Sequence, residues 1–160
     1  MPLLRTARRK WPKFLKPENL IQVSRIQSDV DTQASRRIRE EVFVVEQQVP
    51  LEIEYDEFEQ SATHILARID NVPVGTARWR KTEHGQKLER FAVLKSARRK
   101  GVGAALVQFV LDQIDDQEIA YLNSQVSAIP FYASLGFEAT GGIFYEAGIP
   151  HRKMVLGIEN

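Results

Sequence analysis

A strand, a helix and a second strand follow one another between residues 88 and 125, and this order strongly limits the fold. Apolar spacing predicts a strand over 88–94, a helix with one apolar face over 102–115, and a strand over 119–125. Because the helix returns the chain to the same end of a sheet, the two strands are expected to be parallel neighbours. The sequence therefore predicts a parallel pair in the middle of a sheet.

The segments around this unit predict a mixed sheet that starts as an antiparallel meander, and so an α+β fold. Short polar connections join the apolar runs before residue 94, as in hairpins. The long helix is expected to turn Val102, Leu106, Phe109, Val110 and Ile114 inward. The other expected elements are strands at 20–26, 63–69, 74–80, 137–146 and 152–158, a helix from Asp31 or Thr32 to about Gln47 with Ile38, Val42 and Val45 on one face, an acidic loop or broken helical turn at 52–60, and a short helix from Ser127 to Gly136.

A basic, glycine-rich segment precedes the long helix: Arg98-Arg99-Lys100-Gly101-Val102-Gly103. The start of a helix offers N–H groups without partners and partial positive charge, which suit a phosphate. Glycine lets the main chain come close to an anion and adopt conformations that a Cβ would penalise. A run of charges at a turn is usually only solvated, but the glycines and the helix start favour binding. This segment, called the basic loop below, predicts a phosphate site.

At 160 residues the chain is expected to form one domain over residues 18–160, preceded by a basic arm at residues 1–17. The arm has six Lys and Arg and no acid, which would suit nucleic acid, an anionic membrane or a targeting segment. A solvated terminus is favoured instead, because Pro12 and Pro17 interrupt any amphipathic helix.

Cysteine is absent from the sequence, which excludes disulfides and thiolate metal sites and fits a cytoplasmic protein. No apolar run reaches the roughly 18 residues of a membrane helix. The three histidines are isolated, so no metal is expected. The sequence thus predicts neither a membrane nor nucleic acid as partner and leaves a homodimer open.

Two motifs resemble signatures of the GNAT acyltransferase superfamily. Arg98, Gly101 and Gly103 have the spacing of its acyl-CoA motif, which is Arg or Gln, two residues, Gly, one residue, then Gly or Ala. Residues 128–137 resemble its helix ending in Phe-Tyr, three residues and Gly-Phe. The motifs lie in the expected order, about one helix and one strand apart. The resemblance implies a GNAT-type mixed central sheet flanked by helices.

A narrower similarity is to the ElaA/YjcF-like branch of small acyltransferases. It lies in residues 41–64, from Glu-Val-Phe-Val-Val-Glu-Gln to Thr-His, and in residues 146–151, Glu-Ala-Gly-Ile-Pro-His. The sequence departs from relatives at Arg99, where many have glycine, and at Ser124, where alanine is frequent. The first departure affects the shape of the basic loop.

The resemblance implies an N-acetyltransferase that moves the acetyl group of acetyl-CoA to a primary amine of a small molecule or peptide by direct attack in a ternary complex. The backbone of residues 91–93 would pair with the pantetheine arm like an added strand, and an N–H there would polarise the thioester carbonyl. The residues expected to bind acetyl-CoA are Phe91, Ala92, Val93, Arg98, Arg99, Lys100, Gly101, Val102, Gly103, Ala104, Asn123 and Phe131.

Tyr132 matches the tyrosine that lies near the departing sulfur in this family and donates a proton to the thiolate. Helical spacing puts Phe131 and Leu135 on the face toward the sheet and Tyr132 about 100° away. Spacing alone favours a packing role for Tyr132, whereas the resemblance favours the acid. Asn123, at a strand end, would hold the CoA amide or the substrate, or make a simple strand-end hydrogen bond.

The acceptor must lose a proton, because an ammonium group with a pKa of about 10.4 has no lone pair. Glu89 lies beside the reactive strand and is grouped with the catalytic candidates. Glu46, His64, Glu146 and His151 are grouped with the substrate site. Any of these five could be the base, directly or through water, and the sequence does not choose among them.

Other functional classes fit less well. A dinucleotide-binding oxidoreductase would need a third glycine where Leu106 stands, and a P-loop would need Gly-Lys-Ser/Thr. A non-catalytic acyl-CoA sensor would tolerate loss of Tyr132, which is present. A nucleic-acid-associated protein using the basic arm would show steep salt dependence of binding.

Overall fold

The computed structural model describes residues 20–157, so the expected basic arm at residues 1–17 lies outside the described residues. The elements, in chain order, are β1 (Ile21–Arg25), α1 (Asp29–Arg39), the π-helix η2 (Glu40–Glu46), α2 (Leu51–Glu54), β2 (Thr63–Ile69), β3 (Val72–Thr82), β4 (Gly85–Val93), the 3-10 turn η3 (Lys95–Ala97), α3 (Val102–Gln113), β5 (Ala120–Gln125), the 3-10 turn η4 (Val126–Ala128), α4 (Ile129–Ser134), β6 (Glu138–Glu146) and β7 (Ile149–Leu156).

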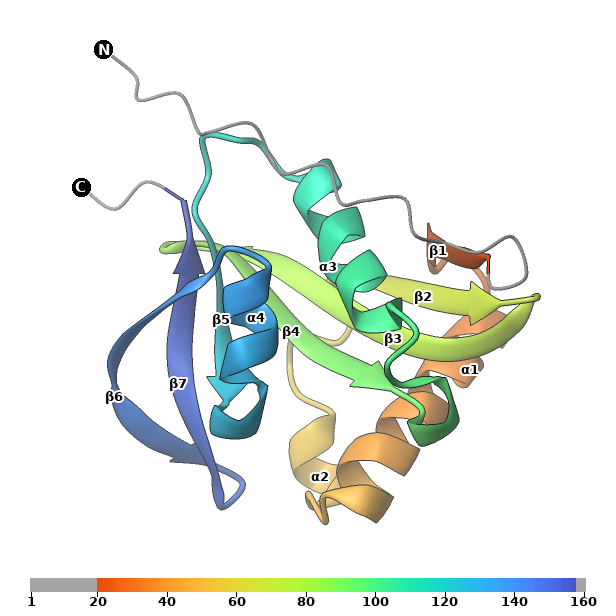
Figure 1. Cartoon of the computed structure of the whole chain (residues 1–160). Coiled ribbons are helices and arrows are strands. Elements are labelled where there is room, and N and C mark those ends of the chain that lie inside the picture. The colour runs from red at the N-terminus through yellow and green to blue at the C-terminus, as the bar shows by residue number, and fades with distance from the viewer. Residues whose placement is uncertain (1–19, 158–160) are drawn as a thin grey trace.

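The strands form one seven-stranded sheet in the order β1-β2-β3-β4-β5-β7-β6 (Figure 1). β4 and β5 run parallel, as predicted for strands joined by a helix, and the other neighbours are antiparallel. The α+β prediction is therefore confirmed for the described residues, with helices flanking a mixed sheet.

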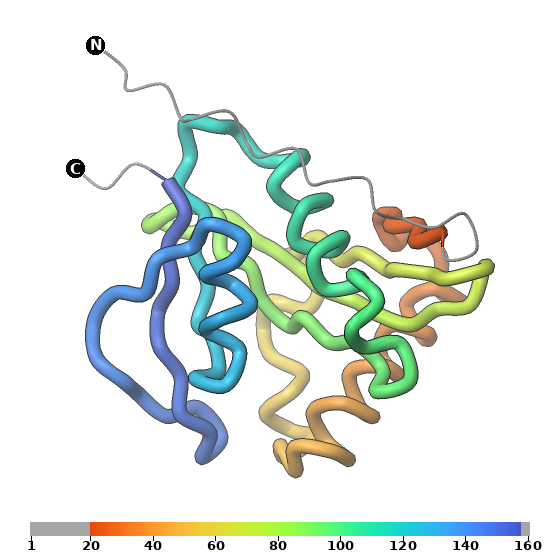
Figure 2. Tube along the Cα trace, viewed as in Figure 1, coloured from red at the N-terminus to blue at the C-terminus, as the bar shows by residue number. Residues whose placement is uncertain are grey.

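Different helices cover the two faces of the first four strands. Successive residues of a strand point to opposite faces, and on β2 Ile65 packs in a core cluster with α3 whereas Leu66 packs in a cluster with α1. Figures 1 and 2 show α3 on one side of these strands and α1 on the other, with α4 beside β5 and β7. The central strands are therefore buried on both faces.

The long helix α3 packs on the sheet with the predicted face. Val102, Leu106, Val110 and Ile114 are buried, and Phe109 is half-buried against the same core. Val107 and Leu111 are buried as well, so the apolar stripe is wider than predicted. Close contact with β3 requires a glycine there, since a Cβ on Gly75 would lie 2.8 Å from Val102 Cγ1.

The predicted helix at residues 31–47 differs from the observed one in two ways. Ser28 is the N-cap, because its hydroxyl accepts from the Asp31 N–H. The second half is a π-helix, in which the Gln47 N–H donates to the carbonyl of Val42, five residues earlier. The wider turn rotates later side chains, and Val45, predicted to share a face with the buried Val42, is 71% exposed. That part of the prediction is wrong.

A bulge in β4 separates it from β5. The β3–β4 register shifts between Thr76 and Arg78, and Arg90 opposite this shift has a φ of 57°. A bulge bends and twists its strand locally. The pairing of β4 with β5 covers only residues 86–88 on β4, and the remainder of β4 up to Val93 has no partner on that side among the described residues.

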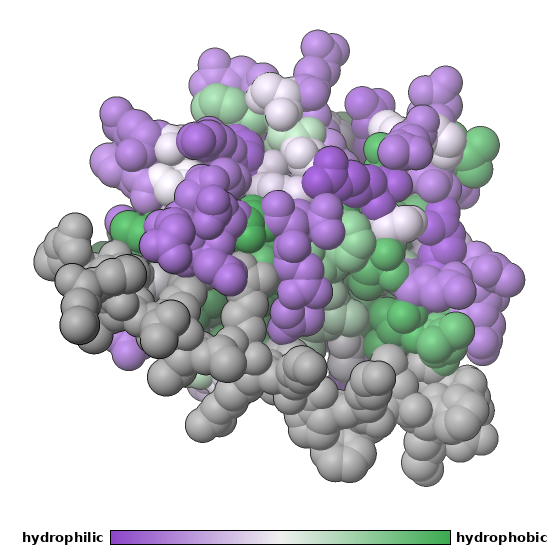
Figure 3. Space-filling view, turned by 90° about the horizontal axis from the view of Figure 1, so that it is seen from above, coloured by the Kyte–Doolittle hydropathy of each residue, from purple (hydrophilic) through white to green (hydrophobic). Residues whose placement is uncertain are grey.

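Hydrophilic side chains predominate on the face seen in Figure 3, and hydrophobic ones form small separate areas. Exposed apolar side chains lie on different elements, for example Val30 on α1, Val72 on β3 and Tyr145 on β6. Within residues 20–157, no helix is both long and apolar enough to span a bilayer.

Candidate active site

A cavity of about 710 Å³ opens where β4 and β5 separate. It lies between η2 and α2 on one side and α4 with the β6–β7 hairpin on the other (Figure 1). The predicted site residues that line it are Glu46, Glu89, Phe91, Val93, Arg98, Asn123, Tyr132, Glu146 and His151. Segments far apart in the sequence thus meet at one cavity.

The basic loop joins this cavity to the start of α3. Ala105 donates the first backbone hydrogen bond of the helix, to the Gly101 carbonyl, and no side chain caps the N-terminus. The N–H groups of residues 102–104 therefore have no acceptor inside the helix. Arg99 and Gly101 have φ values of 62° and 88°, so two left-handed residues turn the chain into the helix. The loop can offer backbone N–H groups and positive charge to an anion.

Arg98 is tied to both sides of the cavity mouth. Its Nε donates to the carbonyl of Val93 at 3.0 Å, and its Nη2 lies 2.9 and 2.8 Å from the two carboxylate oxygens of Glu46. The predicted phosphate-binding cation and the predicted substrate carboxylate are therefore an ion pair. An anion that binds Arg98 competes with Glu46 for the guanidinium.

The free edge of β4 presents backbone groups to the cavity. The Leu94 N–H donates to Val74 on β3. Because the backbone groups of an antiparallel strand alternate in direction, those of Val93 point the other way, toward β5. The carbonyl of Val93 is engaged by Arg98. This edge can pair with an extended ligand, as an added strand would.

Tyr132 is buried among aromatic rings and lines the cavity. Its ring makes edge contacts with Phe91 at 6.2 Å, Phe131 at 4.9 Å and Phe137 at 6.1 Å between centroids. Burial raises the pKa of the Tyr132 hydroxyl, which keeps it protonated. The structure assigns no hydrogen-bond partner among the described residues to this hydroxyl.

The predicted orientation of α4 is wrong. Tyr132 is the buried side chain of this helix, while Phe131 is 37% exposed and Leu135 is only partly buried. The helix is short and contacts η4 and the β6–β7 hairpin. The side of the helix that is buried is therefore the one that carries Tyr132 into the aromatic cluster. Phe131 instead packs on α3 at Gly103. A Cβ built on this glycine would lie 3.1 Å from Phe131 Cζ. A side chain at position 103 would therefore force Phe131 to shift by a few tenths of an ångström.

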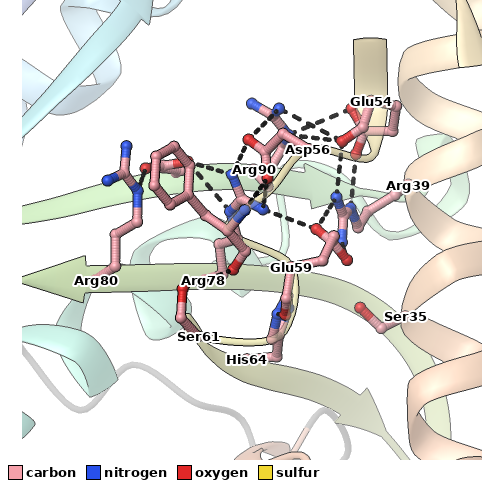
Figure 4. A network of polar contacts seen from close by, with 12 residues as sticks. Ser35, Arg39, Glu54, Asp56, Glu59, Ser61, His64, Arg78, Arg80 and Arg90 are labelled. Atoms are coloured by element: carbon pink, nitrogen blue, oxygen red, sulfur yellow. Dashed lines mark hydrogen bonds and ion pairs between the residues drawn. The ribbon is translucent and has the colours of Figure 1, made fainter. Parts of the chain in front are cut away.

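A network of buried charges forms one wall of the cavity (Figure 4). Arg78 is 0% exposed and contacts three carboxylates, those of Asp56 at 2.6 Å, Glu59 at 2.7 Å and Glu89. Arg39, 2% exposed, binds Glu59 and Glu54 from the α1 side. Arg80 and Arg90 complete the network at its edge. Arg39, Arg78 and Glu59, which support this wall, are not among the site residues predicted from the sequence.

The network shifts the pKa values of its carboxylates in two directions. Burial raises the pKa of Asp56, but hydrogen bonds and charge from Arg78 outweigh burial and lower it to about 2. For Glu89 too, burial raises the pKa, but the hydrogen bond and charge of Arg78 outweigh burial and lower it. For Glu54, burial outweighs the attraction of Arg39 and raises the pKa. Glu89, whose two oxygens are occupied by Arg78 and Arg80, is therefore a weak proton acceptor.

The opposite wall carries a smaller polar group. Asn123 on β5 donates to Glu146 at 3.4 Å, and Glu146 lies 3.8 Å from Nε2 of His151 on β7. His151 stacks on Phe144 with 6.0 Å between ring centroids. These side chains come from three strands, yet the β6–β7 hairpin brings them to one place beside Tyr132 in the cavity.

His64 is not part of this cavity lining. Its Nε2 lies 2.7 Å from the carbonyl oxygen of Glu59, and burial lowers its pKa. The imidazole thus fixes the loop that carries the charge network, which is a structural contact. Among residues 20–157, no cluster of three or more His, Asp and Glu is arranged to hold a metal ion.

Comparisons with known proteins point to one family. Residues 26–158 match the acetyltransferase (GNAT) domain family. The chain is 42% identical over 121 residues to the uncharacterized N-acetyltransferase YjcF of Bacillus subtilis, covering 74% of this chain and 86% of YjcF. It is 36% identical over 141 residues to YyaT of the same organism, covering 85% and 95%.

Solved structures agree with this match. Escherichia coli ElaA superposes with a TM-score of 0.73 at 27% identity, over 86% of this chain and 98% of ElaA. An acyl-CoA N-acyltransferase from Pseudomonas aeruginosa superposes with a TM-score of 0.74 at 24% identity, over 86% and 98%, which supports the fold alone. The chain belongs to the GNAT acetyltransferase family and is an acyltransferase.

Proposed function

We propose that the protein transfers the acetyl group of acetyl-CoA to a primary amine of a small molecule or peptide, by direct attack in a ternary complex. One observation carries the proposal. Arg98 from the basic loop, the free edge of β4 and the Tyr132 side chain line a single cavity, and the rest of the basic loop continues from Arg98 to the start of α3 outside that lining. An acyl-CoA needs these three features for its phosphates, its pantetheine arm and its sulfur.

The residues present fit this co-substrate. The N–H groups at the start of α3 would receive the diphosphate, with charge from Arg98 and Lys100. The backbone of residues 91–93, in which the groups of Val93 face away from β3, would pair with the pantetheine amides. A free N–H on this edge would stabilise negative charge on the thioester oxygen, worth about 3–4 kcal/mol in comparable sites.

The proposed reaction needs two proton movements. When the amine attacks, a C–N bond forms and the C–S bond breaks, so the amine loses a proton and the thiolate gains one. Tyr132 would supply the second proton, since burial keeps its hydroxyl protonated and its side chain lines the cavity. The first proton requires a base on the acceptor side.

The experiment that tests the co-substrate combines binding and turnover. With a Kd of about 10 µM, 1 mM acetyl-CoA should stabilise the protein by ~2.7 kcal/mol, a Tm rise of roughly 5–11 °C. Pantetheine at the same concentration, which lacks the diphosphate, should raise the Tm much less. An unmoved Tm with acetyl-CoA would contradict the proposal. Thiol release with a panel of amines, amino acids and peptides then separates an enzyme from a binding module.

Replacing Tyr132 with Phe should reduce kcat about 100-fold while leaving the KM for acetyl-CoA within twofold. Phenylalanine keeps the aromatic packing with Phe91 and Phe137 and removes only the hydroxyl. Tyr145→Phe, at a tyrosine that is 71% exposed, is the matched control and should keep full activity. Full turnover by Tyr132→Phe would remove Tyr132 as the acid.

A further inference from the structure

We propose that His151 is the general base of the reaction, with Nε2 as the proton acceptor and Glu146 as the group that stabilises the resulting imidazolium. The inference rests on the proposed acyl transfer at this cavity and goes beyond it by choosing one base among the candidates. It follows from the geometry of the imidazole ring and from the partners of the other candidates.

The tautomer of His151 is determined by its backbone contact. Nδ1 lies 2.7 Å from the carbonyl oxygen of Ile149. A carbonyl oxygen can only accept, so Nδ1 must carry the hydrogen. In a neutral ring the lone pair then lies on Nε2. Among the described residues, the structure gives Nε2 no hydrogen-bond donor, so this lone pair is available.

The ring is held in place. Phe144 on β6 stacks on it with an interplanar angle of 23°, and His151 is 8% exposed while lining the cavity. In the sheet, His151 pairs with Gln125 on β5. The side-chain amide of Gln125 in turn donates a hydrogen bond to the side chain of Gln47. A ring fixed on two sides presents Nε2 in one direction, as a base must do to reach a proton.

One carboxylate lies close to Nε2. Glu146 Oε2 lies 3.8 Å from Nε2, and Glu146 Oε1 is held by Asn123. Glu146 is the charged side chain that contacts the ring from β6, and the neighbours from β5 are the uncharged Asn123 and Gln125. An imidazolium formed at His151 gains an ion pair with this carboxylate. The same carboxylate also attracts a positively charged amine.

The other candidate bases are engaged or distant. Glu46 binds Arg98 with both oxygens, and Glu89 binds Arg78 and Arg80. His64 contacts a backbone carbonyl outside the cavity lining. Glu146 lines the cavity with one oxygen held by Asn123, but a carboxylate is an intrinsically weaker base than an imidazole, so it fits the partner role. Among the other four candidates, His151 alone places an unoccupied lone pair at the cavity, in the part of the chain that the structure describes.

The proton balance is complete with this assignment. Nε2 first takes a proton from the ammonium form of the acceptor, which frees the nitrogen lone pair, and releases that proton to solvent. As the C–N bond forms, Nε2 takes the second proton of the nitrogen, and the Tyr132 hydroxyl gives its proton to the sulfur as the C–S bond breaks. Water then carries the proton from His151 back to Tyr132. No further reactant is needed.

His151→Gln tests the proposal with acetyl-CoA and the primary amine that the wild-type protein acetylates fastest. We expect kcat/KM to fall about 100-fold at pH 7, and the loss to shrink as the pH approaches the pKa of the amine, where the amine no longer has to be deprotonated before it attacks. The Tm rise with acetyl-CoA should be unchanged, which confirms folding. His84→Gln, at a histidine 67% exposed, is the control and should keep the wild-type rate and pH profile.

Two results would overturn the assignment. The first is a His151→Gln protein with a wild-type pH profile and a loss below threefold. The second is independent of activity: long-range ¹H–¹⁵N spectra of the free protein at pH 8 should identify Nδ1 as protonated and Nε2 as bare, and the reverse tautomer contradicts the proposal. Wild-type protein without any acetyl-CoA response would instead refute the proposed function.

Discussion

Arg78→Met is expected to destabilise the protein by about 3–5 kcal/mol, the cost of removing one partner from a buried ion cluster. Arg78 is 0% exposed and lies between Asp56, Glu59 and Glu89. Methionine fills the volume of the stem but leaves three carboxylates short of one cation. The expected fall in Tm is roughly 6–20 °C. Denaturant or thermal unfolding measures it.

The control for this substitution is Arg37→Met on the exposed side of α1, where Arg37 donates to the backbone carbonyl of Gln33 at 3.4 Å. It should change stability by less than about 0.5 kcal/mol. Arg78→Lys, which keeps the charge but loses the planar fork, should fall between the two. Equal stability of Arg78→Met and wild type would show that Arg39, Arg80 and Arg90 suffice for the cluster.

The same network determines how stability depends on pH. Because the pKa of Asp56 is lowered to about 2 from 3.8, its contribution is present above about pH 4 and is lost as the pH falls toward 2. The lowered pKa of Glu89 acts in the same direction. In Arg78→Met both pKa values rise, so we expect acid unfolding to begin at a higher pH than in wild type.

The sequence predicted the sheet order around β4 and β5 and the packing of α3, because these depend on the spacing of residues close together in the chain. The parallel β4–β5 pair follows from the length of the connection, and the buried face of α3 follows from a 3.6-residue period. The pattern failed where the period itself changes. Val42 and Val45 share a face only in an α-helix, and the π-helix separates them. No composition signal marks that change of hydrogen bonding.

The site was predictable where a motif carries it and not where tertiary contacts make it. Spacing located Arg98, Gly101 and Gly103, but not the pairing of Arg98 with Glu46, 52 positions away. Arg78 interrupts an apolar strand, and a charge between buried neighbours is the signal that could have revealed the network. Its partners come from other elements, so their identity depends on the fold.

Arg98→Glu is expected to weaken acetyl-CoA binding roughly 100- to 1,000-fold, since the substitution removes a charge-assisted contact and adds repulsion toward a diphosphate. The affected site is the mouth of the cavity, where Arg98 also binds the Val93 carbonyl. Titration of acetyl-CoA by calorimetry or by the shift in Tm gives the ratio of Kd values. Lys81→Glu, an exposed charge reversal outside the cavity lining, has the same effect on net charge and should change the Kd less than threefold.

Glu46→Gln should act in the opposite direction. In the free protein, Glu46 occupies the Nη2 group of Arg98 at 2.8 Å, so a phosphate must displace a carboxylate before it can use that guanidinium. Glutamine removes the competing charge, and acetyl-CoA is expected to bind about three- to tenfold more tightly, a gain of roughly 1 kcal/mol that falls as salt screens it. A result in which Glu46→Gln instead weakens binding as much as Arg98→Glu does would show that the ion pair shapes the phosphate site and that Glu46 does not compete with the phosphate for Arg98. The two substitutions together therefore distinguish an Arg98 that binds the phosphate directly from an Arg98 that only holds the loop in place.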